Sequence, residues 1–134
     1  MTETSPVIFV LDDDESVRTA LKRLIRSAGL NVETFRSAED FLNYSRHDAP
    51  GCLILDVWMP GMSGLDLQDE LAASDFKTPI IFITAHDDED ARSQAMKTGA
   101  VAFLEKPFED QDLLDAIHKA TNRNGSKEHD DGSL

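Results

Sequence analysis

CLILDVWMPGMSG, at residues 52–64, is the stretch of sequence that decides the fold. Its first four residues, Cys52–Leu55, form a short apolar run typical of a strand that is buried on both faces, and Asp56 follows directly. Open α/β sheets bind their ligands at the carboxyl ends of the strands. A Pro-Gly pair then ends the strand, and Ser63 is suited to cap a helix. The stretch therefore places Asp56 where a strand meets a loop, and not inside the core.

Four further runs predict strands, and helical periodicity follows every run. Val7–Leu11 and Pro79–Ile83 are apolar throughout, Asn31–Phe35 alternates polar and apolar residues, and Ala100–Leu104 is short. The apolar positions of the predicted helices are Val17, Leu21, Leu24, Ile25 and Ala28; Ala38, Phe41, Leu42 and Tyr44; Leu65, Leu67, Leu71 and Ala72; Ala91, Ala95 and Met96; and Leu113, Leu114, Ile117 and Ala120. Strands that alternate with helices over short connections predict a doubly wound α/β fold, with a parallel sheet and helices on both faces.

Length and composition predict a single globular domain. The chain has 134 residues, of which 40% are hydrophobic and 29% are charged, and both fractions are typical of a soluble protein. We expect residues 1–6 to form a flexible N-terminus and residues 7–121 to form the folded domain. Residues 122–134 are polar and lack periodicity, so we expect a disordered tail or the start of a linker.

The same composition excludes several classes of partner. The formal charge of −13, from 26 acids against 13 bases, argues against nucleic-acid binding by this segment, since phosphate contacts need clustered cations. No apolar run approaches the roughly 20 residues of a membrane span, and the N-terminus lacks the features of a signal peptide. A single cysteine within a predicted strand fits a reducing compartment, so we expect a cytoplasmic protein without membrane contact.

Polar side chains follow four of the predicted strands at their carboxyl ends. Asp12 and Asp13 follow the first strand, Asp56 the third, Thr84 the fourth and Lys106 the fifth. Because the strands are predicted to be parallel, all five side chains lie at one edge of the sheet. Carboxylates gathered there repel one another unless a cation intervenes. A hard divalent ion resolves the repulsion, and Mg²⁺ leaves coordination positions open for phosphate oxygens.

This constellation predicts a phosphoryl-transfer site with a distinct role for each residue. Asp56 is the expected nucleophile, forming an acyl phosphate, and needs no general base because an ordinary carboxylate is ionised near neutral pH. Asp13 would hold the metal with Asp56 and a backbone carbonyl, and Asp12 would act through bound water. Lys106 would neutralise the phosphoryl oxygens, and Thr84 would donate a hydrogen bond to one of them.

Four separate motifs resemble the receiver domain of two-component response regulators. They are the acidic pair after the first strand, the aspartate followed by MPGMSG, the ITA that ends the fourth strand, and FLEKPF. The resemblance covers residues 7–121. It implies a flavodoxin-like (βα)₅ fold of five parallel strands, and it implies a cis peptide bond between Lys106 and Pro107 that aims the lysine.

The resemblance also implies a function and a partner. Asp56 would accept a phosphoryl group from a sensor histidine kinase or a phosphotransfer protein, with Mg²⁺ bound by Asp13, Asp56 and the carbonyl of Trp58. Thr84 would then move toward the phosphoryl group, and Phe103 would turn inward behind it as the second part of a switch. Such a domain promotes its own phosphorylation and dephosphorylation and is otherwise not an enzyme.

The detailed type is similar to receivers of FixJ and NarL regulators, which precede helix-turn-helix output domains. In that type the face made by the fourth helix, fifth strand and fifth helix controls an output domain, a homodimer or a partner, and hence transcription. A stand-alone receiver that relays or drains phosphoryl groups stays open as an alternative. The charged residues of that face either pair across an interface or are solvated.

Two residues beside the predicted site depart from common family residues. Trp58 is bulky where a small or polar residue is frequent, and His86 lies two residues after Thr84. Both are expected to border the phosphoryl group, limit the approach of water and so set the lifetime of the acyl phosphate.

Two other interpretations of the acidic residues are weaker. Asp12, Asp14 and Ser16 loosely match the DxDx(T/V) motif of haloacid-dehalogenase-type phosphatases, in which Asp12 would be the nucleophile and Asp14 the acid/base. Ser16 is the wrong residue type for that motif, and Asp56 would be left unexplained. A flavodoxin-like FMN carrier would need a Gly/Ser/Thr-rich phosphate-binding loop after the first strand, and this sequence has none there. Taken alone, the acids at 12–14 also suit a charge cluster at a helix N-terminus.

Overall fold

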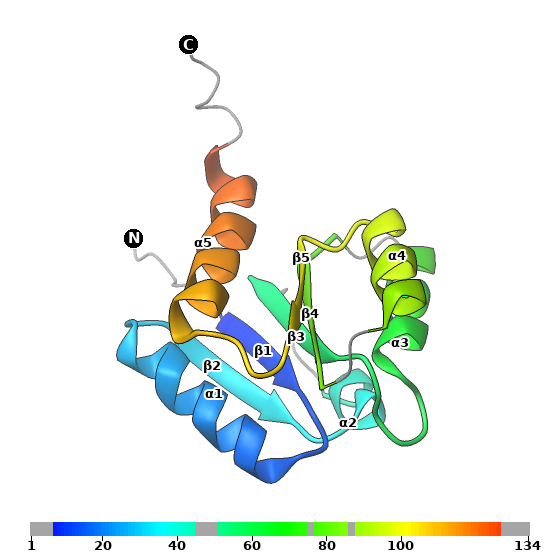
Figure 1. Ribbon diagram of the computed structural model, residues 1–134, viewed down its shortest axis with the longest axis horizontal. Coiled ribbons are helices and arrows are strands. Elements are labelled where there is room, and N and C mark those ends of the chain that lie inside the picture. The colour runs from blue at the N-terminus through cyan, green and yellow to red at the C-terminus, as the bar shows by residue number, and fades with distance from the viewer. Residues whose placement is uncertain (1–6, 45–50, 75–76, 86–87, 127–134) are drawn as a thin grey trace.

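A computed structural model describes residues 7–44, 51–74, 77–85 and 88–126 (Figure 1). Strands and helices alternate along the chain, as the sequence predicts. The elements are β1 (Val7–Leu11), α1 (Glu15–Ser27), β2 (Asn31–Phe35), α2 (Ala38–Leu42), β3 (Cys52–Asp56), α3 (Gly64–Ala73), β4 (Ile80–Thr84), α4 (Glu89–Lys97), β5 (Ala102–Glu105) and α5 (Asp110–Ser126).

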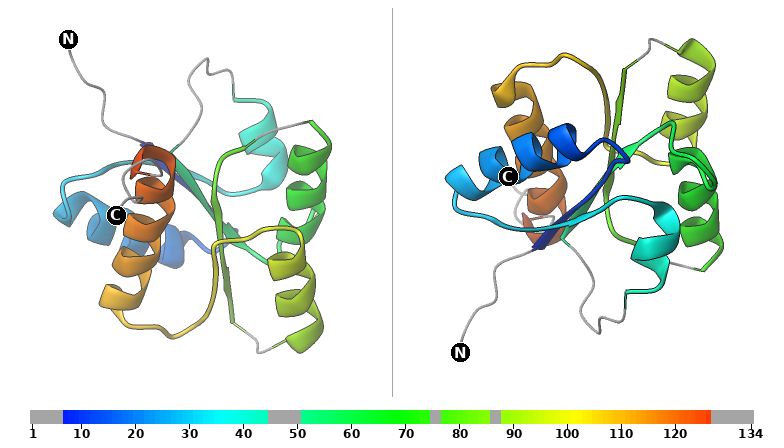
Figure 2. Two further views of the ribbon diagram at one scale, coloured as in Figure 1. Left: turned by 90° about the horizontal axis from the view of Figure 1, so that it is seen from above. Right: turned by 90° about the horizontal axis from the view of Figure 1, so that it is seen from below.

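The strands form one parallel sheet in the order β2-β1-β3-β4-β5. Strand β3, which carries Asp56, lies at the centre between β1 and β4, and all five of its residues are buried. Helices α1 and α5 cover one face of the sheet, and α2, α3 and α4 cover the other (Figure 2). The observed architecture is the five-stranded flavodoxin-like fold that the sequence predicts.

Side chains alternate along each strand, so the sheet has two separate cores. On the face covered by α1 and α5 the core is aliphatic; we call it the aliphatic side. It contains Ile8, Val10, Leu21, Ile25, Val32, Cys52, Ile54, Ile81, Ile83, Val101, Leu113, Ala116, Ile117 and Ala120. On the face covered by α2, α3 and α4 the core contains several phenylalanines; we call it the aromatic side. It contains Phe9, Leu11, Ala38, Phe41, Leu53, Leu55, Val57, Met59, Leu67, Leu71, Ile80, Phe82, Ala91, Ala95, Ala100 and Phe103.

Polar caps fix where the helices begin. The side chains of Asp14, Ser37 and Asp88 accept hydrogen bonds from backbone amides in the first turns of α1, α2 and α4. Ser63 and Asp66 form a reciprocal capping box at the start of α3. The caps follow the strand-end loops directly, so they also fix the direction in which the chain leaves the site.

Several details differ from the sequence prediction, among them strand β4, which begins at Ile80 rather than at Pro79. Strand β5 begins at Ala102 rather than at residue 100. Helix α5 continues through Ser126, five residues into the segment predicted as a tail, because a nucleated helix propagates through polar residues more easily than it starts there. Met96 and Leu42, predicted as apolar contacts of α4 and α2, are 44% and 43% exposed, because other residues form the buried faces of these two helices. In the part of the chain that the structure describes, no helix has the length and apolar character to cross a membrane.

Candidate functional site

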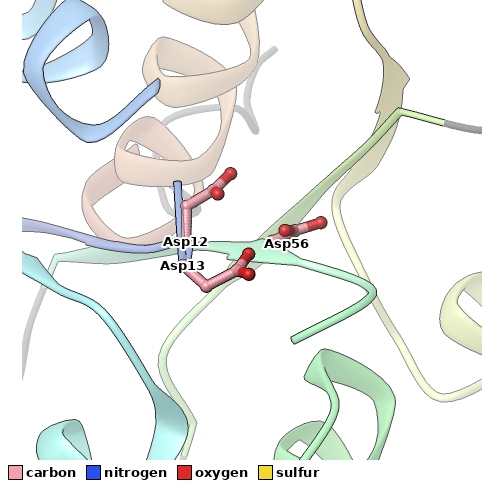
Figure 3. Close-up of side chains that lie close together, drawn as sticks. All are labelled: Asp12, Asp13 and Asp56. Carbon is pink, nitrogen blue, oxygen red and sulfur yellow. The ribbon is translucent and has the colours of Figure 1, made fainter. Parts of the chain in front are cut away.

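Three carboxylates meet at the carboxyl edge of the sheet (Figure 3). Oxygen atoms of Asp12, Asp13 and Asp56 all lie within 4.8 Å of one another. Asp12 is fully buried, Asp56 is 6% exposed, and Asp13 faces solvent. The three residues come from the ends of the adjacent strands β1 and β3, so the strand order alone brings them together.

Backbone and side-chain bonds hold Asp12 in place. The Asp12 N–H donates to the Phe35 carbonyl at 3.1 Å, and the Arg18 guanidinium donates to the Asp12 carbonyl at 2.8 Å. The Asp12 carboxylate accepts from the Asp14 N–H at 2.9 Å and from Lys106 Nζ at 3.0 Å. A buried charge needs such a partner, and Lys106 supplies it from the loop after β5.

The surroundings of Asp56 disfavour the ionised form of its carboxylate. Its Oδ1 accepts from the Trp58 N–H at 3.3 Å. Burial, followed by the negative charge of Asp12, raises the pKa of Asp56 to about 7, and the Lys106 charge and the Trp58 bond oppose the rise only in part. Without a bound cation, Asp56 would therefore be only partly ionised near neutral pH, a consequence of burial that the sequence does not reveal.

The loop between β3 and α3, residues 57–63, wraps the chain closely around Asp56. The Val57 N–H donates to the Ile83 carbonyl at 3.0 Å, and the Gly64 N–H donates to the Val57 carbonyl at 2.9 Å. A Cβ added at Gly64 would collide with the Asp56 carbonyl oxygen, so this position requires glycine. Trp58, in this loop, is 49% exposed.

The remaining predicted residues lie on β4 and β5. Thr84 is fully buried at the end of β4, and its carbonyl accepts from the Lys106 N–H at 2.7 Å. The Lys106–Pro107 peptide bond is cis, as predicted. Phe103 is buried, with Phe82 at 6.1 Å between ring centroids and the Arg92 guanidinium 4.9 Å above its ring.

The structure brings together five of the predicted site residues at the carboxyl edge of the sheet: Asp12, Asp13, Asp56, Thr84 and Lys106. Two further residues that contact the site were not predicted from the sequence. His86 lies outside the described residues. Sequence reasoning missed Arg18, which holds the Asp12 carbonyl, and Glu39, whose carboxylate contacts the β3–α3 loop. Arg18 bonds to the backbone of a residue six positions away and Glu39 to the backbone of Met62, 23 positions away, and no motif or periodicity predicts either contact.

Comparison with protein families matches residues 8–118 to the response regulator receiver domain. The chain belongs to the response regulator receiver domain family. This receiver domain is part of a two-component signal transduction system, as the motifs predict, and the match favours this interpretation over the phosphatase and FMN interpretations. Members of the family generally use Mg²⁺ with acidic residues beside the phosphorylation site, interact with histidine kinases, and are generally not enzymes in their own right.

The receiver domain is similar to several named response regulators and regulatory proteins. It is 52% identical over 120 residues to Nodulation protein W of Bradyrhizobium diazoefficiens, covering 90% of this chain and 53% of the relative. It is 41% identical over 127 residues to Transcriptional regulatory protein FixJ of Azorhizobium caulinodans, covering 95% and 60%. The solved structure of response regulator StyR superposes with a TM-score of 0.85 at 51% identity, covering 93% of this chain and 63% of that chain. The chain therefore spans about half of the length of the curated relatives that it matches.

Proposed function

We propose that Asp56 is the phosphoacceptor of this receiver domain and that its donor is a sensor histidine kinase or a phosphotransfer protein. One observation carries the assignment: Asp56 is the carboxylate at the end of the central strand, beside two other acids and the exposed loop. Asp12 is tied to Lys106 and is fully buried, which makes it the poorer nucleophile.

The donor set fits a magnesium ion. Asp13 and Asp56, with the carbonyl of Trp58, would hold Mg²⁺, and Asp12 would contact it through water. Two features support this assignment. Oxygen atoms of the three acids lie within 4.8 Å of one another, with Lys106 paired to Asp12. Burial and the Asp12 charge also raise the pKa of Asp56, so a bound cation would favour its ionised form. When bound, the ion would neutralise charge on the carboxylates and the phosphoryl oxygens.

The residues of the chain divide the remaining work. A carboxylate oxygen of Asp56 forms the bond to phosphorus while the bond from phosphorus to the donor nitrogen or oxygen breaks, and the electron pair leaves with the donor. Lys106, already at the site edge through its ion pair with Asp12, balances the transferred negative charge. Thr84, at the end of the neighbouring strand, would donate a hydrogen bond to a phosphoryl oxygen.

The same proposal extends to the output of the domain. Phosphorylation would shift a two-state equilibrium in which Thr84 and Phe103 move together, and so change the face made by α4, β5 and α5. That face would control an output domain, a homodimer or a partner, and through it transcription, since a relative such as FixJ is a transcriptional regulatory protein. A receiver that only relays or drains phosphoryl groups is the second candidate.

Two finer assignments belong to this proposal. Trp58, half exposed beside Asp56, would shield the acyl phosphate from water and lengthen its lifetime, together with His86. Replacing Trp58 with Asn should then accelerate the decay of the acyl phosphate, and an unchanged rate would refute this role. A cytoplasmic location is supported by the single cysteine, Cys52, which is a buried free thiol.

Labelling with a small-molecule phosphodonor tests the assignment. We expect acetyl phosphate with Mg²⁺ to add one phosphoryl mass to the wild type and none to Asp56→Asn, as measured by intact-protein mass spectrometry. Chelation of Mg²⁺ should abolish the label on the wild type. Equal labelling of both proteins would refute Asp56 as the acceptor, and labelling lost only in Asp12→Asn would favour the phosphatase interpretation.

A further inference from the structure

We propose that Glu39 is a positioning residue for the active-site loop and holds that loop in its metal-binding conformation. Glu39 lies on α2 and is not one of the five residues assigned to the phosphoryl-transfer site. The inference rests on the proposed function, because it assigns Glu39 a role in the Mg²⁺ affinity of that same site. It concerns only how this chain holds its loop.

The contact joins segments that are distant in the sequence. The Glu39 carboxylate accepts a hydrogen bond from the Met62 N–H at 3.2 Å, across 23 residues. A bond from a backbone amide to an ionised carboxylate is stronger than one between neutral groups. Glu39 therefore connects α2 to the β3–α3 loop by a hydrogen bond.

Gly61 shows how closely the carboxylate approaches the loop. Its φ is +79°, a left-handed conformation that favours glycine. A Cβ added there would lie 2.9 Å from Glu39 Oε2, closer than two such atoms normally come. Glu39 thus packs against the turn of the loop as well as bonding to the amide that follows the turn.

The bonded amide lies between two ends of the loop that are already fixed. On one side the Trp58 N–H donates to Asp56 Oδ1 at 3.3 Å, and on the other the capping box of Ser63 starts α3. Glu39 therefore restrains the segment that connects Trp58 to α3. The carbonyl of Trp58, a proposed metal ligand, belongs to that restrained segment.

Helix α2 is a firm base for this contact although it has only five residues. Ala38 and Phe41, on either side of Glu39, are buried. The Phe41 ring packs edge-on against Phe9 and Phe35, with centroids 5.7 and 5.5 Å away. The aromatic side thus fixes the backbone that carries Glu39, and the hydrogen bond from the Met62 N–H to Glu39 restrains the loop against this backbone.

Three variants isolate the role of the carboxylate. Glu39→Ala removes the acceptor, and Glu39→Gln keeps an acceptor oxygen without the charge. The control is Asp40→Ala, which deletes a carboxylate from the next residue; among the described residues, that carboxylate pairs only with exposed Arg36. Mg²⁺ binding is measured on the full chain by calorimetry and by the fluorescence of Trp58, the single tryptophan, which lies in the loop itself.

We expect Glu39→Ala to weaken Mg²⁺ binding by about fivefold, the value of one hydrogen bond. Glu39→Gln and Asp40→Ala should stay within about twofold of the wild type. The Trp58 emission of Glu39→Ala without Mg²⁺ should differ from that of both controls. Phosphorylation by acetyl phosphate should slow at limiting Mg²⁺ and recover at saturating Mg²⁺, since the acceptor itself is intact.

Wild-type Mg²⁺ affinity in a folded Glu39→Ala protein, or an equal loss in Asp40→Ala, would overturn the proposal. Should Glu39→Ala fail to fold, Glu39→Asp gives a second test, since its shorter side chain keeps the charge but withdraws the carboxylate from the Met62 N–H: weaker Mg²⁺ binding supports the proposal, and unchanged binding overturns it. Weaker Mg²⁺ binding in Glu39→Ala, combined with no label on Asp56 of the wild type at saturating Mg²⁺, would refute the phosphoacceptor assignment and leave the positioning role standing.

Discussion

The two sides of the sheet differ in composition, and the difference separates stability from signalling. The aliphatic side, under α1 and α5, is filled with Ile, Val, Leu and Ala. The aromatic side, under α2, α3 and α4, contains Phe9, Phe41, Phe82 and Phe103. Branched aliphatic side chains occupy few rotamers, so the first core has one well-defined packing.

The aromatic side is the one that reaches the site. Val57 and Met59 from the active-site loop are buried in it, together with Phe103 from β5. Flat rings and flexible methionine tolerate rearrangement better than branched aliphatic residues do. We therefore expect changes on the aliphatic side to alter stability alone, and changes on the aromatic side to alter the site as well.

The largest expected effect is the loss of an aliphatic contact. Ile25→Ala, at a fully buried position of α1, should lower the free energy of unfolding by about 3 kcal/mol in urea denaturation. The folded variant should still be phosphorylated at the wild-type rate. Phe82→Leu, on the aromatic side, should cost less stability yet slow phosphorylation, because Phe82 packs against Gly64 and Phe103. Slower phosphorylation in Ile25→Ala would break the comparison.

Removal of the lysine at the site should have the next largest effect. Lys106→Met leaves the fully buried Asp12 carboxylate without its cation, so the protein without Mg²⁺ should lose about 2 kcal/mol of stability. Added Mg²⁺ should restore part of this loss and should bind more tightly than to the wild type, since one repelling charge is gone. Lys119→Met, at an exposed position of α5, serves as the control in thermal unfolding. Equal losses in the two variants would contradict the role of the ion pair.

The raised pKa of Asp56 gives a pH dependence with a definite sign. Because its pKa rises from 3.8 to about 7 on folding, deprotonation of Asp56 favours the unfolded chain. The stability that protonated Asp56 contributes is present below pH 3.8 and is lost as the pH rises through 7. Without Mg²⁺, Asp56→Asn should therefore be more stable than the wild type at neutral to alkaline pH and match it in acid. A stability difference that is independent of pH would show that burial does not raise this pKa.

The smallest effect concerns the ring on β5. The Arg92 guanidinium lies over Phe103, and its Nη1 donates to the Phe103 carbonyl at 3.5 Å. A double-mutant cycle of Arg92→Ala and Phe103→Leu should give a coupling energy of about 0.5–1 kcal/mol in thermal unfolding. Strictly additive effects would show that α4 does not hold the ring through Arg92.

The sequence predicted the parts of the site that depend on strand ends. Asp12, Asp56 and Lys106 could be placed at one edge because parallel strands share their carboxyl edge, whatever the details of packing. The protonation of Asp56 could not be predicted, since it depends on burial and on the distance to Asp12. The contacts of Arg18 and Glu39 could not be predicted either, because each joins a side chain to a backbone atom that only the folded chain brings near.

Polar residues without periodicity gave the least reliable prediction. Helix α5 passes the expected end at residue 121 and continues through Ser126. Met96 is apolar but exposed, since the buried stripe of α4 needs only small residues against the sheet. Periodicity therefore predicts which face of a helix is buried better than it predicts where the helix ends.

Chemical trapping of the acyl phosphate tests the central claim most directly. Borohydride reduces an aspartyl phosphate to homoserine, which peptide mass spectrometry locates in the sequence. After treatment with acetyl phosphate and Mg²⁺, we predict homoserine at position 56 and unmodified aspartate at positions 12 and 13. Homoserine at position 12 or 13, with Asp56 unmodified, would contradict the account.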